Sequence, residues 1–429
     1  MNILHSPLSL SANPKRVVVL PFQIRTAARD SAKSASSRIG RICDTICALT
    51  ADACQAELDS IYKKFVGRHA QVRTLFLERF KQIQQANDLK GRIGEDHATL
   101  IGAYFTHEFS YQAAAVMNPS VVPHPDQTGA QDGAVNFILS TRTVGEGHIS
   151  TISFREGTFY PDGQVAIKAE SDYAVAAMPR SSYPHDGPVE VVGTAGSPIS
   201  ETVIFPITRA QTNGLEDLRM VPFRDDSGQT TILGTYTAFA GRDMTCELFE
   251  TRDFRTFKLT PLRGSAAAHK GLALFPRKIN GRYAAIGRLD HESLYYLESD
   301  DKTVWNSGEL IVSPVHLWEL LQLGNCGSPI ELDEGWLVLT HGVGPVRQYA
   351  FGAVLLDKAD PRKVIGRTTQ PILAPSEEMR DGYVPNVLYT CGFMRCADWI
   401  FLPYGVADSS VRFASVLIQD ILREIKAVE

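Results

Sequence analysis

A strand–turn–strand pattern recurs five times in this chain and constrains its fold more than any other feature. Each copy has two apolar strands around a polar or glycine-rich centre, and the copies span 134–154, 231–254, 281–301, 335–357 and 398–418. Repeated sheet-forming units without helices between them are typical of β-propellers. A pair of β-sandwiches is the competing interpretation, but the polar centres favour inner strands that face a central channel. The sequence therefore predicts an all-β protein, a five-bladed β-propeller.

Three segments lie outside these copies. Residues 16–22, RVVVLPF, form a β-branched run interrupted by a proline, and we expect this strand to complete the last blade and close the ring. From 30 to 88, apolar residues recur at helical spacing, and Thr50 is a suitable N-cap. We expect two or three helices there, packed on the propeller or on a neighbouring subunit and without a catalytic group. The final stretch, ILREIKAVE, also has a helical period.

These segments lead to a prediction of the domain organisation. A strand within 1–29 closes the ring, 30–95 is a helical insertion, and 96–429 is the catalytic propeller with a C-terminal helix. The helical insertion offers a surface through which a homo-oligomer could form.

Composition and charge narrow the functional classes. Hydrophobic residues make up 44% and charged residues 21% of the chain, which is ordinary for a soluble globular protein. The net charge of −5 argues against a nucleic-acid partner, because such binding needs a basic surface. The sequence has no apolar stretch of membrane-spanning length and no signal-peptide pattern, so we expect no membrane partner.

The cysteines and the missing signatures complete these exclusions. Seven cysteines, an odd number without zinc-finger spacing, indicate a reducing cytoplasm and no metal site. The sequence contains no P-loop, no dinucleotide-binding fingerprint and no nucleophile elbow. We therefore expect a cytoplasmic protein without a bound cofactor.

Polar clusters between the strands are the candidates for chemistry, because a propeller builds its site from loops at the mouth of the channel. Glu216 and Asp217 lie beside Arg219 just before a strand. A carboxyl held in this way suits proton donation, although a solvated turn with an ion pair is the simpler interpretation. Lys270 follows His269 ahead of an apolar strand, and either an anion site or a solvated loop fits that pattern.

Glycine-rich stretches supply the other candidates. Small residues surround His341 and Arg347 in 324–331 and 340–349, which indicates backbone close to a ligand. Arg142 precedes the string GEGHIS, where a β-turn explains the glycines equally well. Asp408 ends the strand LPYGVAD.

Taken together, these clusters resemble glycoside hydrolase family 130, the β-mannoside phosphorylases and β-1,2-mannosidases, over about residues 95–415. The most specific strings are LALFPRKINGRYAAIGRLD, GNCGSPIELDEGWLVLTHGVG, YAFGAVLLDKADPRKVIGRT and LPYGVAD. The resemblance implies a five-bladed propeller and an inverting reaction on a β-mannoside. In the phosphorylases, inorganic phosphate attacks the anomeric carbon and releases α-mannose 1-phosphate. Phosphate is then a co-substrate, and β-1,2-linked manno-oligosaccharides are the expected sugar substrates.

The resemblance also implies roles for individual residues. Asp217 becomes the general acid of an E-D-P-R string that reads EDLR here, with Leu218 in place of the proline. In several family members the proton passes through a sugar hydroxyl. The expected phosphate contacts are Lys270, His341, Arg142, Arg347 and Tyr349. The expected substrate contacts are Asp408, Glu216, Arg219 and Asp290.

Three functions remain open from the sequence. A phosphorylase needs cations to hold phosphate, whereas an inverting hydrolase needs a second carboxylate about 6.5–9.5 Å from the acid. The basic residues favour the phosphorylase, but four spare carboxylates keep an inverting β-1,2-mannosidase possible: Glu216, Glu146, Asp290 and Glu292. A non-catalytic sugar-binding propeller is the third function. The helical segment and the strings at 105–127 and 145–150 depart from the minimal family pattern, so the acceptor sugar is not carried over.

Overall fold

The structure is a computed structural model that describes residues 1–22, 24, 32–87, 93–181 and 186–427. The chain divides into two compact units. The larger unit contains 1–14, 111–170 and 177–429, and the smaller one contains 15–110 and 171–176. The expected domain boundary at 29/30 falls outside the described residues. The expected boundary at 95/96 is wrong, because the smaller unit continues to Ser110.

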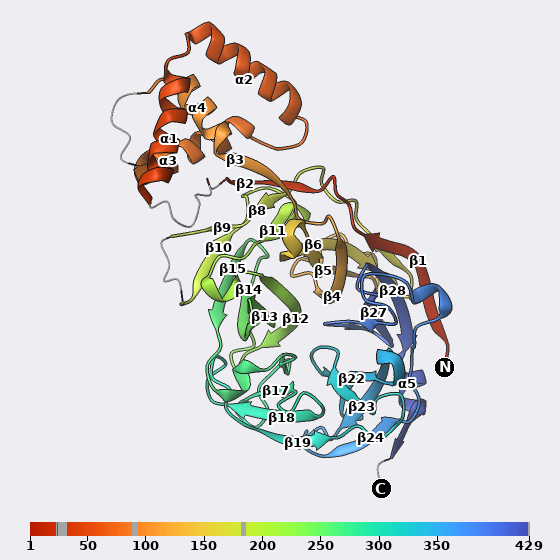
Figure 1. Ribbon diagram of the computed structural model, residues 1–429. Helices are drawn as coiled ribbons and strands as arrows, with labels where there is room; N and C mark the ends of the chain where they lie inside the picture. The colour runs from red at the N-terminus through yellow and green to blue at the C-terminus, as the bar shows by residue number, and fades with distance from the viewer. Residues whose placement is uncertain (23, 25–31, 88–92, 182–185, 428–429) are drawn as a thin grey trace. The chain divides into compact units, whose positions relative to one another are not determined.

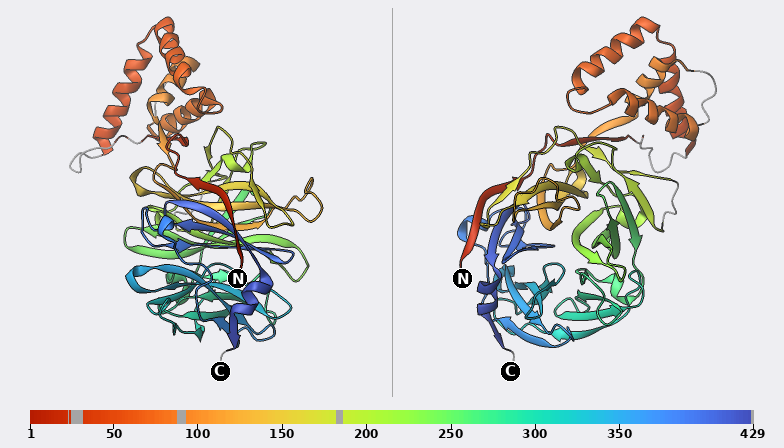
Figure 2. Two further views of the ribbon diagram at one scale, coloured as in Figure 1. Left: turned by 90° about the vertical axis from the view of Figure 1, so that its right-hand side faces the viewer. Right: turned by 180° about the vertical axis from the view of Figure 1, so that it is seen from behind.

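The larger unit consists almost entirely of β-sheet, and its sheets follow one another around a ring (Figure 1). The same ring is visible from behind in Figure 2. Each of the five recurring sequence segments forms an antiparallel hairpin. The hairpins are β5 (Val135–Val144) with β6 (Ser150–Phe159), β13 (Thr230–Ala240) with β14 (Asp243–Thr251), β17 (Tyr283–Gly287) with β18 (Leu294–Ser299), β22 (Trp336–Val343) with β23 (Tyr349–Leu356), and β27 (Trp399–Val406) with β28 (Ser410–Leu417). The predicted all-β class is confirmed.

Shorter strands extend these hairpins into sheets. The first hairpin is joined by β4 (Ala115–Pro123), β7 (Val165–Ile167) and β11 (Thr202–Ile204), and the second by β12 (Gly214–Arg224), β15 (Thr256–Pro261), β10 (Val189–Val192) and β9 (Met178–Pro179). The third hairpin is joined by β16 (Ala273–Leu274) and β19 (Gly308–Val312), and the fourth by β20 (Gln322–Asn325), β21 (Ile330–Glu331), β24 (Val364–Thr368) and β29 (Ile425–Ala427). The last is joined by β25 (Leu388–Tyr389), β26 (Met394–Cys396) and β1 (Ile3–Ser11).

The first strand of the chain completes the sheet of the last hairpin. β1 pairs antiparallel with β28, in a register that places Ile3 opposite Val416. The prediction that residues 16–22 do this is wrong, because β2 (Val17–Pro21) pairs with β3 (Thr106–Ser110) in the smaller unit. The run VVVL is the stronger strand signal, whereas β1 carries Ser and Pro and is stabilised by the edge that β28 offers.

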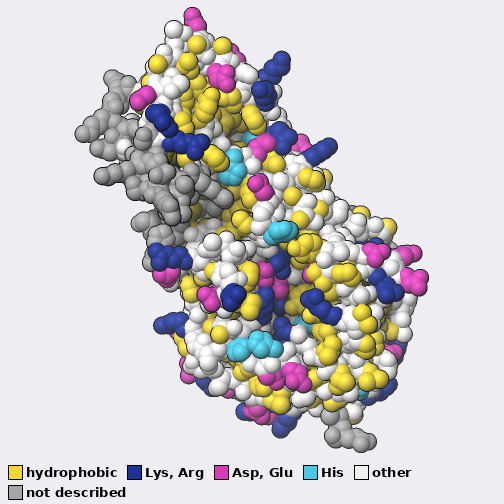
Figure 3. Space-filling model, viewed as in Figure 1, with side chains coloured by type: hydrophobic (Ala, Val, Ile, Leu, Met, Phe, Trp, Pro, Cys, Tyr) yellow, Lys and Arg dark blue, Asp and Glu magenta, His cyan; other side chains and the backbone are white. Residues whose placement is uncertain are grey.

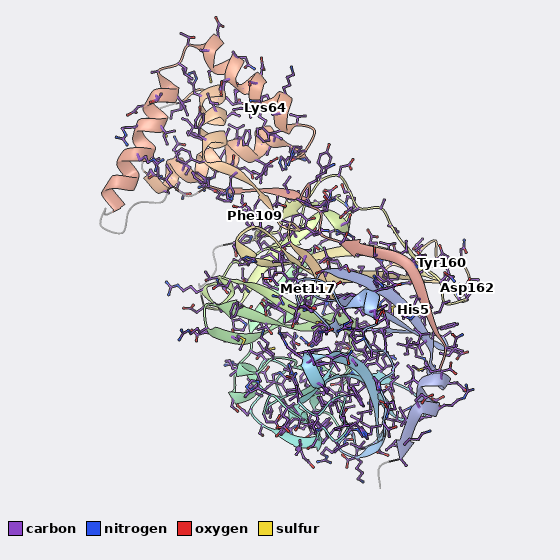
Figure 4. All side chains as sticks on the ribbon, turned by 45° about the vertical axis from the view of Figure 1, so that its right-hand side comes forward. His5, Lys64, Phe109, Met117, Tyr160 and Asp162 are labelled. Atoms are coloured by element: carbon purple, nitrogen blue, oxygen red, sulfur yellow. The ribbon has the colours of Figure 1, made fainter. Side chains whose placement is uncertain are left out.

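A hairpin turn of the first sheet also contacts the last sheet. The indole of Trp399 donates a hydrogen bond to the carbonyl of Pro161 at 3.1 Å, and the Ser415 hydroxyl donates to the carbonyl of Gly163 at 2.8 Å. Figure 4 labels Tyr160 and Asp162 in this turn and His5 on β1. The first and the last sheets of the ring are therefore joined by side-chain hydrogen bonds as well as by packing.

The cores of the ring lie between adjacent sheets. Phe154 of β6 stacks on Phe257 of β15, with ring centroids 5.5 Å apart, and Phe137 meets Phe401 across the first and last sheets at 5.0 Å. Phe275 packs edge-on against Trp336 between the third and fourth sheets. Burying each such side chain stabilises the fold by roughly 1.5–3 kcal/mol. These packed aromatic pairs hold adjacent sheets of the ring against one another.

The smaller unit is built from four helices and a two-stranded sheet. Its elements are α1 (Ala32–Cys47), α2 (Ala51–Phe65), α3 (Val72–Asn87), α4 (Glu95–Tyr104), β2, β3 and the short β8 (Val175–Ala176). The side chain of Thr50 accepts a hydrogen bond from the backbone N–H of Ala53, so the predicted N-cap is confirmed. Cys54, Leu58, Phe80 and Ile101 are buried in one shared core. No helix among the described residues is long and apolar enough to cross a membrane.

The C-terminal helix is shorter than the sequence predicts. α5 (Ile418–Glu424) spans seven residues and buries Ile418 and Ile421. Residues 425–427 then form β29, which pairs with β24. The predicted helix over 421–429 is therefore wrong beyond Glu424, and residues 428–429 lie outside the described part.

Candidate active site

A polar pocket of about 210 Å³ lies in the larger unit. Figure 3 shows Lys, Arg, Asp and Glu side chains inside a hollow at the centre of the ring. Residues on or directly beside strands of the sheets built on all five hairpins contribute to its wall, and none of the lining residues lies in the described parts of 30–110. The residues that line the pocket are Asn118, Arg142, Asp217, Lys270, Arg288, Gln322, His341, Arg347, Tyr349, Val387, Tyr389 and Asp408.

Two strand irregularities place the central carboxylate. The pairing of β12 with β13 shifts register between Glu216 and Arg219, and Asp217 has a left-handed backbone with φ of 59°. β4 has a matching irregularity at Asn118, whose φ is 48°. The amide of Asn118 donates a hydrogen bond of 2.6 Å to Oδ1 of Asp217. Such backbone costs energy, and bulges of this kind re-aim a side chain at a functional site.

Cations surround the carboxylates of Glu216 and Asp217. Nη2 of Arg142 lies 2.6 Å from Oε1 of Glu216, and its Nη1 lies 3.4 Å from Oδ1 of Asp217. Nζ of Lys270 lies 2.8 Å from Oε2 of Glu216. Glu216 therefore bridges two cations. This arrangement holds both positive side chains against the wall of the pocket.

The two wall aspartates have opposite pKa shifts. Burial raises the pKa of Asp217, but the charges of Arg142, Arg219 and Lys270 outweigh it, so the pKa falls to about 2. Burial, reinforced by the negative charge of Asp217, raises the pKa of Asp408 to about 6. Without a ligand, Asp217 is thus a carboxylate, whereas Asp408 takes up a proton near pH 6.

The wall of the pocket also carries aromatic rings and a neutral imidazole. His341 is 1% exposed, and its ring stacks on Tyr349 at 5.8 Å and meets the ring of Tyr389 at 4.8 Å. Burial, together with the charges of Arg288 and Arg219, holds the pKa of His341 well below its usual range. The imidazole is therefore uncharged at neutral pH. It can donate one hydrogen bond but contributes no charge.

Arg288 is a cation of the pocket wall that no carboxylate of the described residues pairs with. Among the described residues, no carboxylate lies within salt-bridge distance of its guanidinium, and its Nε is buried without a hydrogen-bond partner. Oδ1 of Asn118 and Oδ1 of Asn325 are also buried without partners. Buried polar atoms are normally satisfied. Their concentration around this pocket indicates that a polar ligand completes it.

Most of the predicted site residues meet in this pocket, but three have different roles. Asp217, Lys270, His341, Arg142, Arg347, Tyr349 and Asp408 all line it. Glu216 lies behind the wall as the bridge between cations. Arg219 is 2% exposed, donates a hydrogen bond to the backbone carbonyl of Asp217 and does not line the pocket. Asp290 accepts hydrogen bonds from the backbone N–H groups of Glu292 and Ser293, and it stabilises a turn outside the pocket.

The sequence reasoning missed Asn118, Arg288, Gln322 and Tyr389. Arg288 stands two residues before Asp290 in the string GRLD, and the choice of the aspartate overlooked the arginine. For Asn118 and Tyr389 the signal is weak, because the bulge at Asn118 and the buried partner of Tyr389 appear only in the fold. Among the described residues, no group of three or more His, Cys, Asp or Glu is arranged to hold a metal ion.

A family model now defines the class of protein to which this fold and pocket belong. The model of glycoside hydrolase family 130, described as beta-1,4-mannooligosaccharide phosphorylase, matches residues 196–427, more than half of the chain. The chain belongs to this family. The resemblance found in the sequence is thereby confirmed.

Individual relatives make the similarity more specific. The chain is 37% identical over 155 residues to a 1,2-beta-oligomannan phosphorylase of Thermoanaerobacter sp., which covers 36% of this chain and 52% of the relative. It is 30% identical over 232 residues to a beta-1,2-mannobiose phosphorylase of Listeria innocua, covering 52% and 63%. The chain therefore spans about half to two thirds of the length of these relatives.

Solved structures share the fold. The structure of beta-1,2-mannobiose phosphorylase from Listeria innocua with beta-1,2-mannobiose matches with a TM-score of 0.51 and 21% identity, over 73% of this chain and 92% of that one. A putative glycoside hydrolase from Bacteroides ovatus matches with a TM-score of 0.54 and 18% identity, over 75% and 91%. These likenesses concern the fold of the ring.

Proposed function

We propose that this protein is an inverting glycoside phosphorylase that cleaves β-mannosides, with β-1,2-linked manno-oligosaccharides as substrates. The observation that carries the proposal is the combination of charges in the pocket. Its wall holds the buried carboxylate of Asp217 together with Arg288, whose guanidinium has no carboxylate within salt-bridge distance among the described residues. Phosphate is an anionic nucleophile and needs such a cation opposite the leaving group. The mannoside phosphorylases among the relatives support the same activity.

The proposed reaction is a single displacement. An oxygen of inorganic phosphate forms a bond to the anomeric carbon on the face opposite the leaving sugar. The bond from that carbon to the leaving oxygen breaks, and the leaving oxygen takes the proton of Asp217, directly or through a sugar hydroxyl. The products are α-mannose 1-phosphate and the shortened sugar. No second carboxylate is required, because phosphate replaces the activated water of a hydrolase.

Proton donation by Asp217 requires a change in its pKa when the pocket fills. Cations hold the pKa of this carboxyl at about 2 in the free protein. A phosphate anion beside Lys270 and Arg288 offsets part of their charge and brings a like charge near the carboxylate. Both effects raise the pKa of a carboxyl. Phosphate binding is therefore expected to raise the pKa of Asp217 toward the range in which the carboxyl can donate a proton.

The remaining wall residues fit the two ligands. We propose that Lys270, Arg288, Gln322, Arg347 and Tyr349 bind the phosphate, with His341 as an uncharged hydrogen-bond donor. Asn118 and Asp408 then contact the mannosyl unit. Arg142 is held by Glu216 and Asp217, so its main task is to orient these carboxylates.

An inverting hydrolase is less well supported than a phosphorylase. Of the spare carboxylates, Glu216 is bound to two cations, and Asp290 stabilises a turn. Glu146 and Glu292 are exposed and do not line the pocket. None of the four is placed to activate a water.

Product analysis with and without phosphate tests the proposed function. We expect β-1,2-mannobiose to be cleaved only when inorganic phosphate is present, with α-mannose 1-phosphate and mannose as products in equal amounts. Cleavage to mannose alone without phosphate would make the protein a hydrolase. A complete lack of cleavage under both conditions would favour a sugar-binding propeller.

Gly324 provides a test of the phosphate side of the pocket. A β-carbon at this position would lie 2.3 Å from Cε1 of His341 and 3.0 Å from Cδ of Arg288. Because both distances are below van der Waals contact, the Gly324→Ala variant must displace these side chains. We expect the Michaelis constant for phosphate to rise about tenfold, since one charge-assisted hydrogen bond is worth roughly 1.5–3 kcal/mol.

The matched control for this variant is Gly67→Ala. A β-carbon there meets no atom within 4 Å, so we expect unchanged kinetics. A Gly324→Ala protein with a wild-type Michaelis constant for phosphate would show that His341 and Arg288 do not hold the nucleophile.

We also propose a fold and a cellular compartment for this protein. The ring of hairpins fits a five-bladed propeller, in which each recurring segment supplies the central hairpin of one blade. Seven free cysteines, with no disulfide among them, suit a reducing cytoplasm. Association into a homo-oligomer through the helices stays a prediction, and the sedimentation coefficient of the purified protein would test it.

A further inference from the structure

The hydroxyl of Tyr389 has an unusual position at the back of the pocket. Tyr389 lies at the end of β25, is 8% exposed and lines the pocket. Its hydroxyl oxygen lies 2.7 Å from Nη2 of Arg219. Nη1 of the same guanidinium donates a hydrogen bond of 2.7 Å to the backbone carbonyl of Asp217. Arg219 therefore ties the phenol to the strand irregularity that carries the acid.

The direction of the bond between Tyr389 and Arg219 follows from their chemistry. An arginine side chain can only donate hydrogen bonds, so the phenol oxygen must be the acceptor. The single hydrogen of the hydroxyl is then left for another partner. Among the described residues, none accepts this hydrogen. Since the side chain lines the pocket, a ligand that fills the pocket can accept this hydrogen.

The hydroxyl keeps its hydrogen under working conditions. Burial, more than any other factor, raises the pKa of Tyr389 above its usual value, so the phenol stays neutral at any physiological pH. The positive charge of Arg219 on the oxygen also polarises the O–H bond. Linked hydrogen bonds of this kind strengthen one another. Tyr389 is therefore a stronger donor than an isolated phenol.

The surroundings of the ring indicate which ligand receives the hydrogen. The ring of Tyr389 meets the ring of His341 at 4.8 Å and that of Tyr349 at 6.3 Å. His341 lies close to Arg288, because a β-carbon on Gly324 would meet both side chains. We propose that Tyr389 is a catalytic residue that donates its hydroxyl hydrogen to the phosphate nucleophile, with Arg219 as the positioning residue that fixes the phenol oxygen. This inference rests on the proposed function and adds a neutral donor to the cations of the phosphate site.

The isosteric variant Tyr389→Phe tests this inference by direct binding. It removes one oxygen and leaves the ring packed against His341. We expect calorimetric titration of the substrate-free protein with inorganic phosphate to show a dissociation constant raised about 10- to 100-fold, because a hydrogen bond to an anion is lost. The Michaelis constant for the mannoside at saturating phosphate should change less than twofold.

Tyr296→Phe is the matched control. Its hydroxyl donates to Oε1 of Glu298 at 3.0 Å on β18, and Tyr296 does not line the pocket. We expect its phosphate affinity to equal that of the wild type. Thermal unfolding of both variants shows whether the ring stays folded.

The outcomes separate this inference from the proposed function. An unchanged phosphate affinity in Tyr389→Phe, with a wild type that binds phosphate, would overturn the role of Tyr389 alone. A raised Michaelis constant for the mannoside with unchanged phosphate affinity would assign the hydroxyl to the sugar and also overturn it. A wild-type protein that binds no phosphate would overturn the proposed function itself.

Discussion

The Asp217→Asn variant is expected to lose at least ~100-fold, and up to ~10,000-fold, of its turnover on an unactivated β-mannoside. The leaving oxygen of such a substrate needs a proton in the transition state, and the amide has none to give. The amide can still occupy the left-handed backbone position and accept the hydrogen bond from Asn118. An aryl mannoside with a good leaving group needs less protonation and should lose much less activity. Initial rates with the two substrates at saturating phosphate measure this difference.

Glu216→Gln is the internal control for the acid. Glu216 bridges Arg142 and Lys270 and does not line the pocket. We expect a moderate loss of activity of similar size with both substrates, because the cations loosen but no proton donor disappears. The assignment of the acid is wrong if Asp217→Asn keeps near-normal turnover, or if Glu216→Gln is the inactive protein.

Arg288→Ala is expected to weaken phosphate binding about 10- to 100-fold. Its guanidinium has no carboxylate partner among the described residues, so its full charge is available to an anion. Lys270→Ala should have a smaller effect, because Glu216 already compensates the Lys270 ammonium at 2.8 Å. Phosphate titrations followed by calorimetry give both constants.

Arg282→Ala is the control for the loss of an arginine. Arg282 stands beside the same hairpin and pairs with Asp300 and Glu298 away from the pocket. Its removal should leave phosphate affinity unchanged. A larger effect for Lys270→Ala than for Arg288→Ala would contradict this expectation. It would show that the ion pair with Glu216 does not weaken the contribution of Lys270 to phosphate binding.

The sequence predicted the architecture well where the pattern was long. All five recurring segments form hairpins, because two apolar strands around a polar turn carry the same signal in every copy. It failed where tertiary contacts decide the outcome. β1 has little strand propensity of its own and forms on the edge of β28, whereas the stronger run at Val17–Pro21 pairs elsewhere.

The site residues show the same difference between local sequence patterns and tertiary contacts. Residues in conspicuous strings, such as Asp217, Lys270 and His341, were found and do line the pocket. Arg219 was assigned to substrate because it stands beside the acid in the string, although its side chain points into the protein and is 2% exposed. Spacing along a strand normally predicts the side to which a residue points. The register shift at Asp217 breaks that alternation, and no propensity indicates such a shift in advance.

The pairing of β1 with β28 has a consequence for biosynthesis. Ile3 pairs with Val416, so β1 cannot pair with β28 until residue 416 has been synthesised. Contacts between residues so far apart in the sequence form slowly, although the entropic cost of closing the loop grows only with the logarithm of its length. The pocket draws its walls from Asn118 through to Asp408. A chain that lacks β27 and β28 therefore keeps most of these groups but loses Asp408 and the partner strand of β1.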